Sequence, residues 1–182
     1  MRAFLLPALE VLEVLLIAFV SVAIIKTYLA QPFLVSGDSM EPNLSDGNYL
    51  LVDEVSYRFR NPGRGEVVVF RYPQNESVFY VKRIIGLPGE TVNVEDGKVT
   101  IINDGYPRGM VLAEDYLPLS ARTAGNLEVK LQEGQYFVMG DNRLYSFDSR
   151  SWGTLPQRDI LGVVRYNLWP INEARAVTVP VY

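Results

Sequence analysis

A long apolar segment near the amino terminus is the feature that most constrains how this chain can fold. Residues 11–30 read VLEVLLIAFVSVAIIKTYLA, and about 20 helical residues cross the ~30 Å hydrocarbon core of a bilayer. The uncharged centre, residues 14–25, is shorter than that, but the Lys26 side chain can reach the interface. The segment predicts a single uncleaved membrane anchor over residues 1–31, with the rest of the chain on one side of the membrane.

Two other interpretations of this segment remain open. A cleaved signal peptide requires a small residue two places before Ala30, where this chain has Tyr28. An amphipathic helix, buried or interfacial, is suggested by Glu10 and Glu13, which lie one turn apart. The flanking charges are too few and too evenly divided to set the orientation of an anchor.

Beyond Pro32 the chain changes to short apolar runs, rich in β-branched and aromatic residues and separated by turn residues. These runs are NYLLVDEV, GEVVVFRY, SVFYVKRIIG, ETVNVEDGKVTI, LEVKL, QYFVMG and DILGVVRYNLW. Within them, Asp96 and Gly97 predict the turn of a β-hairpin. The pattern predicts a mainly β domain over residues 32–182, an antiparallel β-sandwich or partly open barrel. Residues 106–127 depart from the pattern and are predicted to form an irregular insertion.

The composition excludes several classes of function. The 182 residues include no Cys and no His, which excludes disulfides, thiol catalysis, a Ser-His-Asp triad and most catalytic zinc sites. The formal net charge of -4 argues against a nucleic-acid partner. We therefore expect neither a metal nor a cofactor, and a serine nucleophile in this chain needs Lys, Asp, Glu or Tyr as its base.

One serine has a setting that suggests such a nucleophile. Ser39 lies in VSGDSMEPNL, residues 35–44, with Gly37 before it and Pro42 after it. Glycine and proline define the backbone path at these positions. The pattern favours a serine held at a defined place in a turn.

A lysine on a later strand is a candidate base. If residues 78–85 form a strand, Tyr80, Lys82 and Ile84 share one face. Removal from water favours the neutral amine of a lysine, which can accept a proton from a serine hydroxyl. A surface strand whose lysine reaches solvent is the simpler interpretation of the alternation alone. Arg83 lies equally between apolar residues, so the pattern does not single out the lysine.

A third stretch, GDNRLYSFDSRSWG, is dense in polar residues directly after an apolar run. Residues 141–143 are typical of a turn in which Asp and Asn bond their own backbone. Ser146, Asp148 and Arg150 then recur among aromatic residues. If these side chains are buried, they need one another as partners.

Taken together, these stretches resemble the type I signal peptidases, membrane-bound Ser/Lys serine proteases that remove signal peptides from exported proteins. The anchor, SGDSMEPNL, RGEVVVF, YVKRIIGLPGE and GDNRLYSFDSRSWG occur in the order typical of that family and cover most of the chain. The resemblance implies a single-pass protein of the cell membrane with its catalytic domain on the extracytoplasmic face. The implied partners are signal peptides of preproteins and the lipid bilayer, with the export machinery as a further candidate.

The resemblance also implies roles for individual residues. Ser39 matches the nucleophile and Lys82 the general base, while Ser146 matches a hydroxyl that orients the lysine amine. Asp148 and Arg150 match a supporting ion pair. The implied reaction is acyl transfer through an ester-linked acyl-enzyme.

Substrate recognition is implied in the same way. Members of the family prefer small residues before the cut, typically in an Ala-x-Ala pattern. Gly37 occupies the position at which some members have a serine whose hydroxyl holds the oxyanion, so this chain leaves a second oxyanion donor unassigned. Four apolar residues match positions near the substrate pockets, and each could equally belong to an ordinary core: Phe33, Val35, Met40 and Val81.

Two rival hypotheses differ from this one. Self-cleaving SOS-type repressor modules also couple a serine in an SGxSM-like turn to a lysine on a later strand, but a DNA-binding helical domain precedes theirs. A membrane-anchored β domain that binds a partner without catalysis belongs to another class. That hypothesis predicts that replacing Ser39 and Lys82 leaves the function intact.

Overall fold

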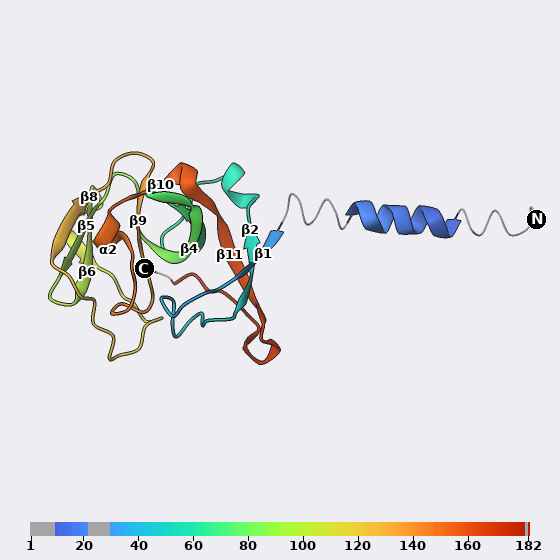
Figure 1. The fold of residues 1–182 in the computed structure, drawn as a ribbon. Coiled ribbons are helices and arrows are strands. Elements are labelled where there is room, and N and C mark those ends of the chain that lie inside the picture. The colour runs from blue at the N-terminus through green and yellow to red at the C-terminus, as the bar shows by residue number, and fades with distance from the viewer. Residues whose placement is uncertain (1–9, 22–29, 181) are drawn as a thin grey trace, which may run out of the picture.

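The structure, a computed structural model, describes residues 10–21, 30–180 and 182 (Figure 1). Residues 10–21 are helical, with exposed apolar side chains. Among the described helices, none combines the length and the hydrophobicity that a membrane crossing requires. Residues 1–9 and 22–29 of the predicted anchor lie outside the described part of the chain, so the anchor stays a prediction.

Two antiparallel sheets form the body of the protein. The larger sheet has the strand order β1-β2-β11-β3-β4-β9-β10, with β12 paired to β11. Its strands are β1 (Ala30–Leu34), β2 (Tyr49–Asp53), β3 (Val67–Tyr72), β4 (Asn75–Gly86), β9 (Gln135–Met139), β10 (Leu155–Pro156), β11 (Ile160–Trp169) and β12 (Arg175–Ala176). The smaller sheet has the order β7-β6-β5-β8. Its strands are β5 (Thr91–Glu95), β6 (Lys98–Asn103), β7 (Tyr106–Val111) and β8 (Leu127–Lys130).

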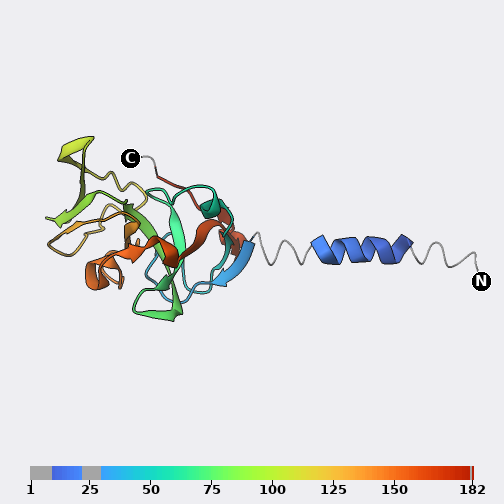
Figure 2. The same ribbon diagram turned by 90° about the horizontal axis from the view of Figure 1, so that it is seen from above.

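The two sheets occupy different ends of the domain. β5, β6 and β8 lie together at one end in Figure 1, and β1 and β2 lie at the other, an arrangement that Figure 2 shows from above. Short helical elements lie between strands: η1 (Ser56–Arg58), α2 (Ser149–Trp152), η2 (Gln157–Asp159) and η3 (Ile171–Glu173). β1 and β10 end the strand order of the larger sheet without pairing with each other, so this sheet is open.

The prediction of a mainly β domain with antiparallel sheets is confirmed. Every apolar run picked out in the sequence contains a strand, and every strand pair is antiparallel. Asp96 and Gly97 have φ angles of 50° and 76° and join β5 to β6, as a two-residue hairpin turn requires. The start of β1 at Ala30 means that the last two residues of the range predicted as anchor belong to a strand.

The prediction of an irregular insertion over residues 106–127 is wrong in its first part, because residues 106–111 form β7. Pro107 and Gly109 make this segment look like a turn, but β7 is an edge strand, where a missing N–H is tolerated. Gly109 has φ +87°, and a Cβ there would lie 2.6 Å from Thr100 Cγ2, so glycine permits the close approach to β6. Residues 112–126 contain neither helix nor strand.

Alternation along β3 places hydrophobic clusters on both faces of the larger sheet. Val67 and Val69 belong to a cluster that also holds Met40, whereas Val68 and Phe70 belong to another on the opposite face. A third cluster joins the smaller sheet to the ends of β4 and β9. The segment after β1 is therefore packed against the larger sheet and fixed by its core.

Candidate active site

Ser39 lies in a tight turn that follows β1. Gly37 has φ +95°, a conformation that favours glycine, and its N–H donates to Asp46 Oδ1 at 2.7 Å. On the other side, Met40 is fully buried, and its carbonyl accepts the N–H of Leu44 at 2.9 Å. The turn is therefore anchored on both sides of the half-buried serine.

Lys82 lies on β4, and its side chain contacts this serine. Its side chain is buried, and Nζ donates to Ser39 Oγ at 2.7 Å and to the carbonyl of Val81 at 2.9 Å. Serine and lysine are 43 positions apart in the chain. The two residues predicted as nucleophile and base are thus in direct contact.

Burial changes the protonation of this lysine. Loss of solvent lowers the pKa of Lys82 from 10.5 to about 8, although the nearby carboxylates of Asp148 and Asp141 act in the opposite direction. The amine also lies 5.4 Å from the centre of the Tyr80 ring. A substantial fraction of the amine is therefore neutral at mildly alkaline pH, and a neutral amine can accept a proton.

The neighbouring Arg83 points to the other face of β4 and has different partners. Its guanidinium pairs with both carboxylate oxygens of Asp141, at 2.9 Å and 2.6 Å, and donates to the carbonyl of Gly65 at 2.8 Å. It also lies 4.2 Å from the centre of the Tyr116 ring. The structure thus separates two adjacent cations that the sequence pattern could not tell apart.

The predicted ion pair between Asp148 and Arg150 is present and buried. Two bonds of 2.8 Å join the guanidinium and the carboxylate, and Asp148 Oδ2 also accepts the N–H of Gly140 at 3.0 Å. Burial acts to raise the pKa of Asp148, but the bonds from Arg150 and Gly140 hold it below its usual value. Asp148 also caps the start of α2.

Ser146 lies beside the nucleophile turn but does not hydrogen-bond to the lysine. A Cβ on Gly140 would lie 2.2 Å from Ser146 Oγ and 2.3 Å from the carbonyl oxygen of Ser39, so only glycine fits between them. Ser146 Oγ is buried and makes no well-formed hydrogen bond among the described residues, although its interaction with Asp148 helps to lower the pKa of that carboxyl. Among the described residues, the Lys82 amine donates to Ser39 and to the carbonyl of Val81, and the expected bond with Ser146 is not formed.

The polar turn after β9 holds the nucleophile turn in place, a role that local sequence reasoning missed. The N–H of Asn142 donates to the carbonyl of Ser39 at 3.1 Å, and its side-chain amide donates to the carbonyl of Asp38 at 3.0 Å. Asn43 donates to Asp141 Oδ2 at 2.9 Å. The density of polar residues in this stretch is the available signal, but a local pattern does not identify their distant partners.

Arg143, in the polar turn after β9, binds the irregular loop of residues 112–126. Its guanidinium pairs with the carboxylate of Glu114 and donates to Thr123 Oγ1 at 2.8 Å and to the Tyr116 hydroxyl at 2.9 Å. Nothing in the sequence pattern connected this loop to the site. The loop is tied to the polar turn by buried contacts.

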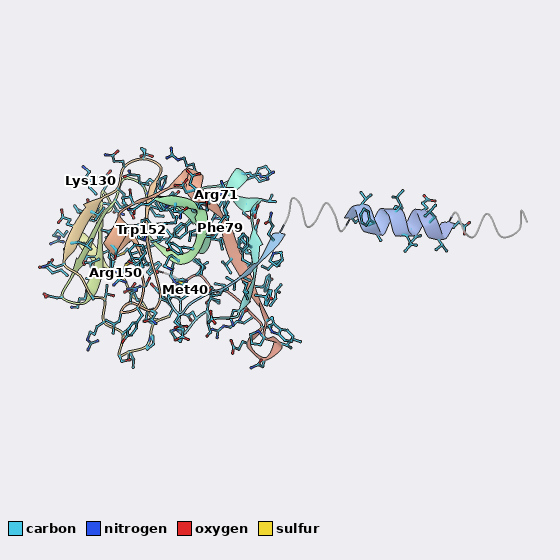
Figure 3. All side chains as sticks on the ribbon, in the orientation of Figure 1. Met40, Arg71, Phe79, Lys130, Arg150 and Trp152 are labelled. Carbon is cyan, nitrogen blue, oxygen red and sulfur yellow. The ribbon has the colours of Figure 1, made fainter. Side chains whose placement is uncertain are left out.

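A small cavity of about 100 Å³ opens beside the serine and lysine. Three of the four residues predicted near the substrate pockets line it: Phe33, Val35 and Val81. The fourth, Met40, is buried in the core cluster that contains Val35. Sequence reasoning missed several lining residues, among them Leu50, Val69, Phe79 and Tyr80. Met40 and Phe79 are labelled in Figure 3.

This geometry suits nucleophilic catalysis by a serine with a lysine base. A hydroxyl contacts an amine whose pKa is lowered to about 8, beside an apolar cavity. In the part of the chain that the structure describes, no group of acidic side chains is arranged to hold a metal ion.

Comparisons with known proteins agree on one family. Residues 8–169 match the family described as "Signal peptidase, peptidase S26". The probable signal peptidase I-1 of Synechocystis sp. is 37% identical over 90% of this chain and 83% of its own length. Signal peptidase I T of Bacillus subtilis is 36% identical over 90% of this chain and 86% of its own length.

Further relatives come from other bacteria. Signal peptidase IB of Staphylococcus aureus is 32% identical over 90% of this chain and 92% of its own length. A crystal structure of a signal peptidase I from Enterococcus faecalis aligns at 32% identity with 57% of this chain and 97% of that chain, with a TM-score of 0.48. By its family match and by these curated relatives, the chain belongs to the signal peptidase family, peptidase S26, and is a serine peptidase.

Proposed function

We propose that this protein cleaves signal peptides from exported preproteins, with Ser39 as the nucleophile and Lys82 as the general base. The observation that carries the proposal is the 2.7 Å contact between Ser39 Oγ and Lys82 Nζ. The names of the relatives, signal peptidases I, support the choice of substrate. The chain has no histidine, so lysine is the base within reach of this serine.

The reaction proceeds through an acyl-enzyme. The neutral Lys82 amine takes the proton of Ser39, and Oγ attacks the carbonyl carbon of the peptide bond to form a tetrahedral oxyanion. The oxyanion collapses, the carbon–nitrogen bond breaks, and the ammonium of Lys82 gives its proton to the departing amine. The neutral lysine then activates a water, which hydrolyses the ester and restores the serine.

Oxyanion stabilisation requires hydrogen-bond donors that are in place before the reaction. The backbone N–H of Ser39 is one donor available in the turn. Gly37 has no hydroxyl to supply another, so the second donor is a backbone N–H, a water or a hydroxyl from elsewhere in the chain. The turn geometry, fixed by Gly37 and by the Asn142 amide, suits a preorganised site.

The cavity beside Ser39 supports a preference for small residues before the cut. Its volume of about 100 Å³ and its apolar lining from Phe33, Val35 and Val81 suit a methyl side chain better than a large one. An Ala-x-Ala pattern presents two such side chains on one face of an extended peptide. Met40 supports this lining from the core behind it.

Substrates of this kind are met at a membrane. We place the single membrane anchor before β1, within residues 1–29, and the extracytoplasmic catalytic domain over residues 30–182. The apolar sequence of residues 11–30 supports this placement. Contacts with the bilayer and with the export machinery belong to the same proposal.

The decisive experiment uses the full chain purified in detergent. A precursor whose signal peptide ends in Ala-x-Ala is incubated with the wild-type protein, with Ser39→Ala and with Lys82→Met, and the cut product is identified by mass. Wild-type cleavage directly after the second Ala, with loss of cleavage in both variants, is the expected result. Unchanged cleavage by Lys82→Met would rule out the lysine as base.

A further inference from the structure

A second cavity, of about 300 Å³, lies beside the turn that carries Ser39 and shares no lining residue with the apolar one. We call it the leaving-side groove, and three segments form its walls: Glu41 and Pro42 of the nucleophile turn, loop residues 118 and 120–122, and residues 141–144. The first and third segments also hold Ser39 in place. The loop segment belongs to the irregular region that has no part in the dyad.

The groove is continuous with the catalytic turn. Asn142 lines it and donates its N–H to the carbonyl of Ser39 at 3.1 Å. Glu41 lines it as well, and its N–H donates to the carbonyl of Asp38 at 3.2 Å. The two cavities flank Ser39 along the chain, since residues 33–36 line the apolar one and Glu41 and Pro42 line this one.

Two kinds of charge surround the groove. Asp141 and Arg143 are buried and already paired, with Arg83 and Glu114 respectively. Arg122 is exposed, and within residues 10–21, 30–180 and 182 it forms no ion pair. Within the described part of the chain, its guanidinium donates only to the adjacent carbonyl of Ala121, at 3.3 Å. Arg122 is therefore a cation available to a ligand in the groove.

Glu41 is the opposite charge at the same groove. It is exposed and, like Arg122, makes no ion pair among the described side chains. It belongs to the turn that carries Ser39, whereas Arg122 belongs to the loop. The groove thus presents a carboxylate from the catalytic turn and a guanidinium from the wall contributed by the loop.

We propose that the leaving-side groove binds the first residues of the mature protein, and that Arg122 selects acidic side chains at the second and third positions after the cut. Glu41 disfavours an acidic side chain directly after the cut. This inference rests on the proposed peptidase function and extends it to the product side of the bond. It gives the loop of residues 112–126 a role in choosing among substrates.

The test uses precursors that share one signal peptide and differ only at the second and third positions after the cut: two Asp, two Lys or two Gln. The wild-type full chain in detergent is expected to cleave the Asp substrate with a kcat/KM about two- to fivefold above that of the Lys substrate, the range of an exposed ion pair. Arg122→Glu is expected to reverse this order. High salt is expected to reduce the preference, because screening weakens exposed charge pairs.

Arg108→Glu is the matched control, since Arg108 is an exposed arginine on β7. It makes the same change in net charge and is expected to keep the wild-type preference. An unchanged preference in Arg122→Glu would overturn the inference. Arg122→Gln separates selection from folding: it should abolish the preference between the Asp and Lys substrates while keeping the wild-type midpoint of denaturant unfolding. An equal loss on all three substrates in both Arg122 variants would instead make Arg122 a support of the loop and overturn the inference.

The two proposals fail in different ways. If the wild-type protein cuts none of the three precursors, the proposed function itself is wrong. If it cuts all three with equal kcat/KM and Ser39→Ala cuts none, the peptidase function stands and only the role of the groove is wrong.

Discussion

The two faces of β4 place adjacent cations in different environments. Arg83 is buried against a carboxylate that pairs with it through two hydrogen bonds. Lys82 is buried just as deeply, but its amine contacts a hydroxyl and a backbone carbonyl, neither of which carries a charge. One face neutralises its cation by pairing, and the other lowers the pKa of its cation by burial.

This difference separates a structural cation from a catalytic base. A buried guanidinium that pairs with a carboxylate stays charged and holds two segments together. A buried amine without a paired carboxylate loses its proton more readily and becomes a base. Asp148 and Asp141 are near enough to oppose this change, yet burial dominates and the pKa falls to about 8. The fold therefore keeps the carboxylates close but bonded to arginines.

The largest expected effect is on the catalytic rate, when Lys82 is replaced by arginine, the cation found on the other face of β4. Lys82→Arg keeps the positive charge but cannot lose its proton near neutral pH. We expect kcat to fall by about 10²–10⁴-fold, the contribution of general-base catalysis. Initial rates on an Ala-x-Ala precursor measure this. A Lys82→Arg protein that keeps a tenth or more of the wild-type rate would contradict the role of a neutral amine.

The next effect comes from removing the carboxylate on the other face. Asp141→Asn leaves the Arg83 charge buried without its partner, and we expect the free energy of unfolding to fall by about 3–5 kcal/mol. Denaturant unfolding at pH 7 measures the change. Arg158→Gln is the control, because Arg158 is 84% exposed and lies 3.7 Å from Asp159; it should change stability by less than about 1 kcal/mol. Equal effects of the two substitutions would refute the contrast.

For Lys82→Met we expect a smaller change in the free energy of unfolding, and one of opposite sign. The pKa of this lysine is 10.5 in the unfolded chain and about 8 in the folded protein. Burying the protonated lysine at pH 7 therefore lowers the free energy of unfolding by about 3 kcal/mol at most. We expect Lys82→Met to raise the free energy of unfolding by about 1–3 kcal/mol at pH 7, at the expense of activity.

The pH dependence of that difference gives a check on its cause. Between the two pKa values the unfolded wild-type chain binds more protons, so its stability rises with pH from about 8 to 10.5. The advantage of Lys82→Met should therefore shrink over this range. Denaturant unfolding at several pH values measures it, and a variant less stable than wild type at pH 7 would argue against desolvation as the cause.

The smallest effect is the slope of activity with pH. Only the neutral form of Lys82 accepts the serine proton, so kcat/KM should rise about tenfold per pH unit below the pKa of about 8 and level off above it. Rates measured from pH 6 to 10 give the midpoint. A midpoint near 10.5 would show that the lysine is solvated, and a flat profile would exclude it as the titrating base.

Much of the fold was readable because strands leave a local pattern. The run VVVF before Arg71 and the hairpin turn at Asp96 and Gly97 follow from β-propensity and turn geometry. Residues 106–111 are predicted to be irregular because their Pro and Gly suggest a turn, but they form β7. An edge strand tolerates both residues, and its edge position depends on a pairing that local sequence does not encode.

The candidate site divides in the same way. Ser39 and Lys82 could be named from the resemblance of their motifs to the family, whereas the alternation alone favoured a lysine that reaches solvent. Ser146 is expected from the resemblance to orient the lysine amine; in the structure it lies against Gly140 beside the nucleophile turn, and no bond to Lys82 forms among the described residues. The polar residues around Asn142 are a local signal of a site, but the bond from Asn142 to the nucleophile turn cannot be predicted locally because its partner is about a hundred residues away.

The sequence by itself determined a mainly β chain without histidine or cysteine, and with it the need for a serine base of another kind. Only the tertiary structure decided which of two adjacent cations could serve. Lys82 and Arg83 have nearly the same local surroundings in the sequence, and alternation merely sends them to opposite faces. A contact across 43 residues gave Lys82 a hydroxyl, and one across 58 residues gave Arg83 a carboxylate. The physical reason is that a pKa depends on the charges and solvent around a group in space, which the fold brings together.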